Sequence, residues 1–186
     1  MADLTKGKGV NAGEDKIRTG LDVIRGGIQD IYIMKRLLVA NGVASDVIDG
    51  FIDLKSGEYD ALYAAMDKSA FDDAVDRERS RVEEVDRKAE AETAGAGVEQ
   101  GLQCDDPAAC GESENDSMMI IRSQLELIDR KLNQIMMVKK SLTIAGAAHK
   151  MLAKLIADAS AAANELFMSV TEDELDSMIA GRISEA

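Results

Sequence analysis

The chain has 186 residues, with 22 lysines and arginines against 35 aspartates and glutamates, and a formal net charge of −13. This excess of negative charge argues against direct binding to nucleic acid or to an anionic membrane, because both need a basic surface. No stretch reaches the roughly 18 apolar residues of a membrane span, and the first residues lack the apolar core of a signal peptide. We therefore expect cytoplasmic synthesis.

Aromatic residues make up only 3% of the chain, and there is a single proline. A core must therefore be built from Ile, Leu, Val, Met and Ala, and no segment has the alternating pattern of a strand. We predict an all-α fold: an internally duplicated helical bundle with coiled-coil-like heptad helices, joined by a charged helix and a flexible acidic linker.

An internal repeat with an offset of 104 residues organises the chain. Residues 17–76 align with residues 121–180 without a gap, and 13 of the 60 pairs are identical. Positions that are not identical often remain apolar, as in Tyr63 and Phe167. Two unrelated amphipathic helices also align over a shared heptad, but such a heptad does not explain the matches further along. The sequence therefore predicts an internal duplication.

The leading segment of each copy carries an apolar stripe with steps of four and three residues, as in a supercoiled helix. The choice of Ile and Leu at its two heptad positions favours three or four strands over two, so we predict a multi-helix bundle. The predicted interaction seam consists of Ile17, Leu21, Ile24, Ile28, Ile31, Lys35, Leu38, Ile121, Leu125, Ile128, Leu132, Ile135, Lys139 and Leu142.

Lys35 and Lys139 occupy the same seam position in the two copies. The preferred interpretation is that their stems lie on apolar surface while the ammonium groups reach water. A second is that a single polar seam residue fixes the helix register. A third is a catalytic lysine, which needs a pocket.

Turn signals divide the rest of the first copy. Gly42, after Asn41, predicts a left-handed helix end. A helix over residues 45–56 follows, and Gly57 is expected to break it before a longer helix begins at Glu58.

Residues 77–92 are rich in opposite charges three or four positions apart, which predicts a solvated spacer helix. Residues 93–117 contain glycines, a proline and acidic residues, which predict a flexible linker. The chain thus divides into a first helical repeat (1–76), the spacer, the linker and a second helical repeat (118–186). Most of the negative charge lies between the two seam segments, since residues 43–117 contain 7 basic and 21 acidic side chains.

Both cysteines, Cys104 and Cys110, lie in the predicted linker. Their spacing matches neither a zinc motif nor the Cys-x-x-Cys of redox enzymes, and His149 is the only histidine. In a reducing cytosol both thiols should be free, whereas after release into an oxidising medium they are a candidate disulfide within the loop or between subunits.

In the second copy the Asn-Gly signal is replaced by Ala-Gly-Ala-Ala at residues 145–148. We therefore expect the helix to continue through these residues to Phe167. Residues 171–174, with the sequence Thr-Glu-Asp-Glu, form a capping box that should open a last short helix.

No catalytic constellation stands out. The sequence has no Walker loop, no Gly-x-Gly-x-x-Gly, no nucleophile elbow and no His-Glu-x-x-His, and a single histidine makes a triad hard to build. The acidic run Asp46, Asp49 and Asp53 has helical spacing, and a solvated helix face explains it better than a cation site. We therefore expect a protein that is not an enzyme, with no catalytic, cofactor-binding or metal-ligating residues.

The preferred functional hypothesis is a structural or adaptor protein of a multi-subunit assembly, which contacts protein partners through duplicated helical surfaces as a homo-oligomer or in a larger assembly. Small acidic helical chains are common among virus and phage particle components, such as neck, tail, scaffold or fibre-attachment parts. By this analogy of composition, we expect a virion component. One alternative is an acidic inhibitor or decoy that binds a basic protein. Another is a chaperone-like adaptor that shields a partner helix.

Overall fold

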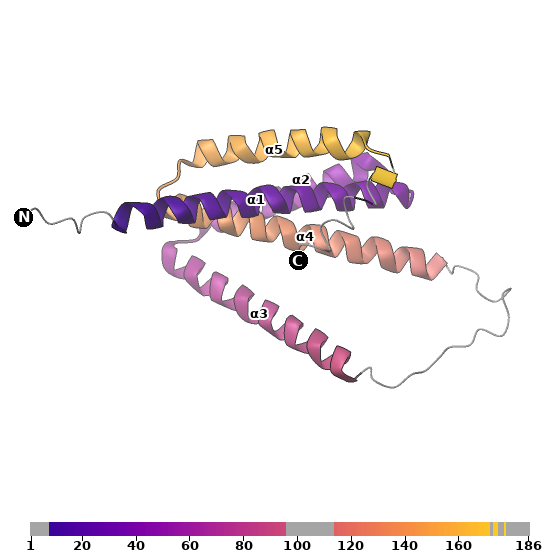
Figure 1. Ribbon diagram of the computed structural model, residues 1–186, viewed down its shortest axis with the longest axis horizontal. Coiled ribbons are helices and arrows are strands. Elements are labelled where there is room, and N and C mark those ends of the chain that lie inside the picture. The colour runs from indigo at the N-terminus through magenta and orange to yellow at the C-terminus, as the bar shows by residue number, and fades with distance from the viewer. Residues whose placement is uncertain (1–7, 96–113, 172, 175–176, 178–186) are drawn as a thin grey trace, which may run out of the picture. The chain divides into compact units, whose positions relative to one another are not determined.

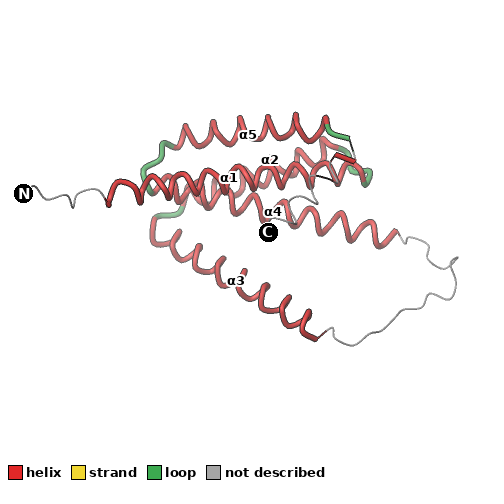
Figure 2. Tube along the Cα trace, viewed as in Figure 1, coloured by secondary structure: helices red, strands yellow, loops and turns green. Residues whose placement is uncertain are grey.

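The computed structural model describes residues 8–95, 114–171, 173–174 and 177, and this part of the chain contains five helices and no strand (Figures 1 and 2). The helices are α1 (Lys8–Ala40), α2 (Ser45–Ala65), α3 (Lys68–Gly95), α4 (Glu114–Ile144) and α5 (His149–Ser169). The all-α prediction is confirmed. Among the described helices, none has both the length and the hydrophobicity that crossing a membrane requires.

The described residues fall into two compact units. The first unit comprises those of residues 1–64 and 119–186, and it is a bundle of α1, α2, α4 and α5. The second comprises those of residues 65–118, with α3 as its main element. All four helices of the first unit contribute to one core, so the two predicted repeats share their buried side chains. The largest fully buried ones are Phe167, Ile24, Leu38, Ile48, Ile128, Ile135 and Leu152.

Helices α1 and α4 approach each other closely at two glycines of α1. A Cβ atom on Gly27 would lie 3.0 Å from Cγ1 of Ile135, and one on Gly20 would lie 2.8 Å from a Cδ atom of Leu142. Gly20 faces Leu142, whereas the later glycine, Gly27, faces the earlier residue Ile135. The two helices are therefore antiparallel. A Cβ atom at Gly27 would therefore require Ile135 to shift by a few tenths of an ångström.

Both helical hairpins turn through the same glycine motif. Gly42 and Gly146 have φ angles of +86° and +100°, in the left-handed region that glycine adopts without a steric cost. In each turn the residue after the glycine donates its N–H to the carbonyl five residues earlier, at 3.0 Å and 2.9 Å. This is a Schellman helix end. The left-handed end predicted at Gly42 is confirmed.

The prediction that the second helix runs on through Gly146 is wrong. α4 ends at Ile144 and α5 begins at His149, because Gly146 makes the same turn as Gly42. Ala147, which follows the glycine, is buried in the core and holds the turn in place.

The predicted helix break at Gly57 is also wrong. α2 runs through this glycine, whose helix-interior cost of about 1 kcal/mol is outweighed by burial of side chains on either side of it, Ile48 and Tyr63. The chain breaks instead before α3, where a carboxylate oxygen of Asp67 accepts the backbone N–H of Ala70 at 2.9 Å. Asp67 is therefore the N-cap that ends the α2–α3 connection.

Helix α3 contains residues 77–92, the predicted charged spacer, and begins before them at Lys68. Arg81 donates two bonds to Glu78, at 3.0 Å and 2.6 Å, an i, i+3 pair of the kind that supports an exposed helix. Residues 96–113, which make up most of the predicted linker, lie outside the described residues.

The capping box predicted after α5 is confirmed. Thr171 donates its N–H to the Glu174 carboxylate at 2.9 Å, and Glu174 donates its N–H to Oγ1 of Thr171 at 3.4 Å. The backbone bond from Thr171, with a smaller contribution from its hydroxyl, holds the pKa of Glu174 below its usual value. Thr171 and Asp67 thus both cap helices, at positions 104 residues apart. Most of the helix predicted beyond this box lies outside the described residues.

Candidate interaction surfaces

The apolar residues of the predicted seam face the interior of the first unit. Those in the core cluster are Ile24, Ile28, Ile31, Leu38, Ile128, Leu132, Ile135 and Leu142. Those that are partly buried and pack against it are Ile17, Leu21, Ile121 and Leu125. The seam therefore holds the helices of one chain together.

Lys35 of α1 is enclosed within the bundle, with only 3% of its side chain exposed. Its ammonium group donates to Asp49 of α2 at 2.6 Å and to Asn164 of α5 at 2.8 Å, and lies 5.5 Å from the ring centre of Tyr32. Asp49 was expected on a solvated face, but it serves as the counter-ion of this lysine. A charge-assisted contact of this kind ties three helices together.

Lys139 of α4 is held in the same way, with 8% of its side chain exposed and its ammonium 2.5 Å from a carboxylate oxygen of Asp60. Asp60 and Asn164 are 104 residues apart, as are the two lysines. Lys35 of α1 therefore binds α5, and Lys139 of α4 binds α2, at positions that the 104-residue offset pairs. Neither ammonium group extends into water. These partners were not predicted from the sequence, although both pairs lie at the offset of 104 residues.

Two tyrosines of α2 connect it to α4. The hydroxyl of Tyr59 donates to Asp129 at 2.9 Å, that of Tyr63 donates to Asn133, and the two rings stack with 6.4 Å between their centres. Burial, followed by the bond to the carboxylate, raises the pKa of Tyr59 to about 12. Burial likewise raises the pKa of Tyr32 on α1. Tyr59 is therefore a neutral hydrogen-bond donor under ordinary conditions.

A pocket of about 250 Å³ opens beside Lys139. It is lined by Asp60, Tyr63, Ala64, Met136, Lys139, Lys140, Thr143 and His149. Asp60 accepts a bond from Lys139, and Tyr63 donates one to Asn133 of α4. These side chains therefore serve the packing of the bundle. Among the described residues, no three His, Cys, Asp or Glu side chains come together as a metal site would require.

Large apolar side chains lie exposed on the outer helices at matching positions. On α2 these are Val47, which is 63% exposed, and Leu62, which is 47% exposed. On α5 they are Met151 and Leu166, at 50% and 47%. The members of each pair are 104 residues apart. Because both helices bury other side chains in the core, these four are not needed to complete it.

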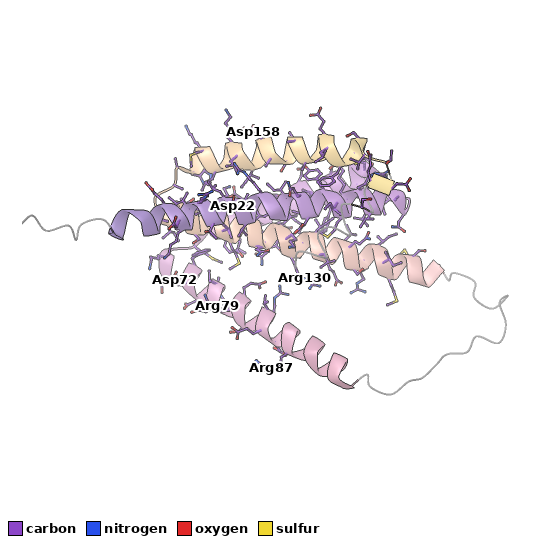
Figure 3. All side chains as sticks on the ribbon, in the orientation of Figure 1. Asp22, Asp72, Arg79, Arg87, Arg130 and Asp158 are labelled. Atoms are coloured by element: carbon purple, nitrogen blue, oxygen red, sulfur yellow. The ribbon has the colours of Figure 1, made fainter. Side chains whose placement is uncertain are left out.

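We name the two surfaces by their helices and define each by residues on its outer side. The α2 face consists of Val47, Gly50, Leu54, Gly57, Ala61 and Leu62. The α5 face consists of Met151, Lys154, Asp158, Ala161, Glu165 and Leu166, and Figure 3 labels Asp158 on α5.

A shallow groove of about 470 Å³ runs between the α5 face and α1. Its lining combines apolar side chains with charged ones, namely Arg25, Met151, Lys154, Leu155, Asp158 and Ala159.

Cys104 and Cys110 lie outside the described residues, so the candidate disulfide has no structural description. Comparison with protein families, with curated proteins and with solved structures finds no match.

Proposed function

We propose that this protein is a non-enzymatic structural or adaptor subunit of a multi-protein assembly, and that it meets its neighbours through the α2 and α5 faces. The observation that carries the proposal is the recurrence of exposed apolar residues, Val47 with Met151 and Leu62 with Leu166, outside a core that is already complete. Exposed apolar patches of this kind commonly mark protein–protein contacts.

The proposal includes an internal duplication of residues 17–76 and 121–180. The two lysine contacts support it, because Lys35 binds Asn164 and Lys139 binds Asp60 at the same offset. Two equivalent hairpins in one chain present two related surfaces, so a single subunit can occupy a position between two neighbours. Such positions occur in the neck, tail, scaffold or fibre attachment of virus and phage particles, which is the setting we propose.

Isolation of the native assembly through an affinity tag on the full chain tests the proposal. We expect native mass spectrometry to give a fixed copy number with constant neighbours, and chemical cross-links from Lys150 and Lys154 to reach those neighbours. A Leu62→Asp/Leu166→Asp double variant should keep its circular dichroism spectrum and lose the neighbours, because both side chains are exposed in the isolated bundle.

Thr19→Asp provides the matched control, since it adds a charge at an exposed position of α1 that belongs to neither face. The control should retain all neighbours. A chain that is always recovered alone would contradict the proposal. Recovery of one basic protein, released by moderate salt and absent from any stable particle, would favour the acidic decoy instead.

A further inference from the structure

We infer that the α2 face of one copy of this protein binds the α5 face of a second copy, so that chains associate head to tail. The inference rests on the proposed contact role of the two faces. It goes beyond that role by identifying the occupant of each face as another copy of the same chain.

The α2 face carries an uninterrupted uncharged stripe. Val47, Gly50, Leu54, Gly57 and Ala61 follow steps of three and four residues along the exposed side of α2. Val47 and Leu54 are the most exposed large apolar residues of this helix, and a Cβ atom at either glycine would meet nothing within 4 Å. Aliphatic side chains between small residues form ridges and grooves into which another surface can fit closely.

Acidic residues border this stripe. Asp46, Asp53 and Glu58 are exposed on α2, and Asp129 of α4 accepts the bond from Tyr59, the residue after Glu58. The only basic residue of α2 is a lysine bound to Glu58. Two α2 faces brought together would therefore place like charges opposite each other, which opposes a symmetric α2–α2 contact.

The α5 face differs from the α2 face in charge at equivalent positions. Lys150 occupies the position equivalent to Asp46, and Arg25 that equivalent to Asp129. A further cation, Lys154, lines the groove together with Arg25. The two faces share exposed apolar residues, but of the four acidic positions at the edge of the α2 face, two are basic beside the α5 face (Lys150 and Arg25) and two are alanine (Ala157 and Ala162).

Apolar fit and charge thus favour the same pairing. The groove beside α5, with Leu155 and Ala159 in its lining, can receive Leu54, while the acidic edge of the α2 face meets the basic edge of the groove. Asp158 of the groove gains a partner in Lys55, the lysine of α2. Because the two faces are unlike, a dimer leaves one free face at each end, and the association continues into a ring or a filament.

Sedimentation velocity and light scattering of the full chain over a range of concentrations, at low salt, test the inference. Leu54→Asp places on the α2 face the residue that α5 already carries at the equivalent position 158, so the bundle is expected to tolerate it. Met151→Asp is the matching change on the α5 face, at a residue that is half exposed. Circular dichroism and urea midpoints verify that both variants fold.

We expect the mass of the unsubstituted protein to rise with concentration, and each variant alone to dissociate at least tenfold more readily. A mixture of the two variants should form one-to-one heterodimers and nothing larger, because Leu54→Asp keeps an intact α5 face and Met151→Asp keeps an intact α2 face. Higher salt should weaken every association.

Three results would overturn the inference: an unsubstituted protein that stays monomeric throughout, variant mixtures that stay monomeric, or loss of association in only one of the two variants. A monomeric protein that nevertheless occupies a fixed place among other proteins in its native assembly would refute self-association and leave the proposed function intact.

Discussion

The ammonium group of Lys139 is enclosed by protein, while its partner Asp60 keeps part of its carboxylate in water. The two side chains are 8% and 47% exposed. Removal of the lysine leaves a carboxylate that water can solvate, whereas removal of the carboxylate leaves a buried cation without its counter-ion. The two deletions break the same contact but should differ in their effect on stability.

We expect Asp60→Ala to lower the free energy of unfolding by about 3 kcal/mol, as loss of one partner does for a buried pair. Lys139→Met should cost about 1 kcal/mol or less, because the methionine fills the space and creates no buried charge. Asp60→Asn should fall between them, since Asn164 shows that an amide oxygen can accept from a lysine at the equivalent position. Urea unfolding followed by circular dichroism measures all three, and equal losses for Asp60→Ala and Lys139→Met would contradict this account.

Tyr59 makes stability depend on alkaline pH. Its pKa is raised from the usual 10.0 to about 12, so the folded protein binds the phenolic proton more tightly than the unfolded chain does. The resulting stabilisation is fully present below pH 10 and is lost as the pH rises from about 10 to about 12. The ultraviolet difference titration between the protein and Tyr59→Phe should have its midpoint near the higher value. Asp129→Asn should lower this midpoint, and a difference titration centred near 10 would disprove the assignment.

At the scale of helices, two glycines have opposite roles. Gly57 lies inside α2, where a Cβ atom would meet nothing within 4 Å, while Gly146 holds a turn with φ of +100°. Helix formation is favoured by alanine at the first position, whereas a left-handed backbone is strained by alanine at the second.

We therefore expect Gly57→Ala to raise the free energy of unfolding by roughly 0.5–1 kcal/mol and Gly146→Ala to lower it by about 1 kcal/mol. Urea or thermal unfolding of the two variants checks the signs. A stabilised Gly146→Ala protein would mean that α4 and α5 join as one continuous helix.

Gly57 and Gly146 show why the sequence predicts the helices but not every helix end. Apolar periodicity is local, so the helical class, the inward stripe of α1 and α4 and the capping box at Thr171 can all be predicted. Whether a glycine ends a helix depends on burial around it and on hydrogen bonds across the turn, which is why the expectations at Gly57 and Gly146 fail. The cap at Asp67 was missed because a single aspartate gives a weak signal without the matching glutamate.

At the scale of the whole molecule, each buried lysine contacts a helix that lies far away in the sequence. Lys35 needs α5 and Lys139 needs α2, so the two hairpins form one core. Periodicity predicts which residues are buried but not which helix covers them, because the partners lie 129 and 79 residues away in the chain. For the same reason the outer faces could be found only after the buried sides of α2 and α5 were known.

The shared core predicts how an isolated first hairpin behaves. In a fragment of residues 1–67, a second copy can take the place of the missing hairpin, with Ile31 of that copy facing Gly27 as Ile135 does in the whole chain. We expect this fragment to be helical and dimeric in equilibrium sedimentation. A helical monomer would show that the hairpin needs no partner.

The second hairpin should behave differently. In a fragment of residues 118–186, the position equivalent to Gly27 is Lys131, so a second copy would bring this lysine against Ile135. We expect no equivalent dimer, and preferential one-to-one association when the two fragments are mixed. Equally stable dimers of both fragments would contradict the role assigned to the glycine.

The pair of positions Gly27 and Lys131 has a consequence for engineering. The glycine admits Ile135 against the α1 backbone, while the ammonium of Lys131 lies 2.9 Å from a carboxylate oxygen of Asp30. A dimer of identical subunits must carry the same residue at both such positions, so each mutation there acts twice. In this chain the two positions are encoded separately, so Gly27 and Lys131 can each be redesigned without altering the other.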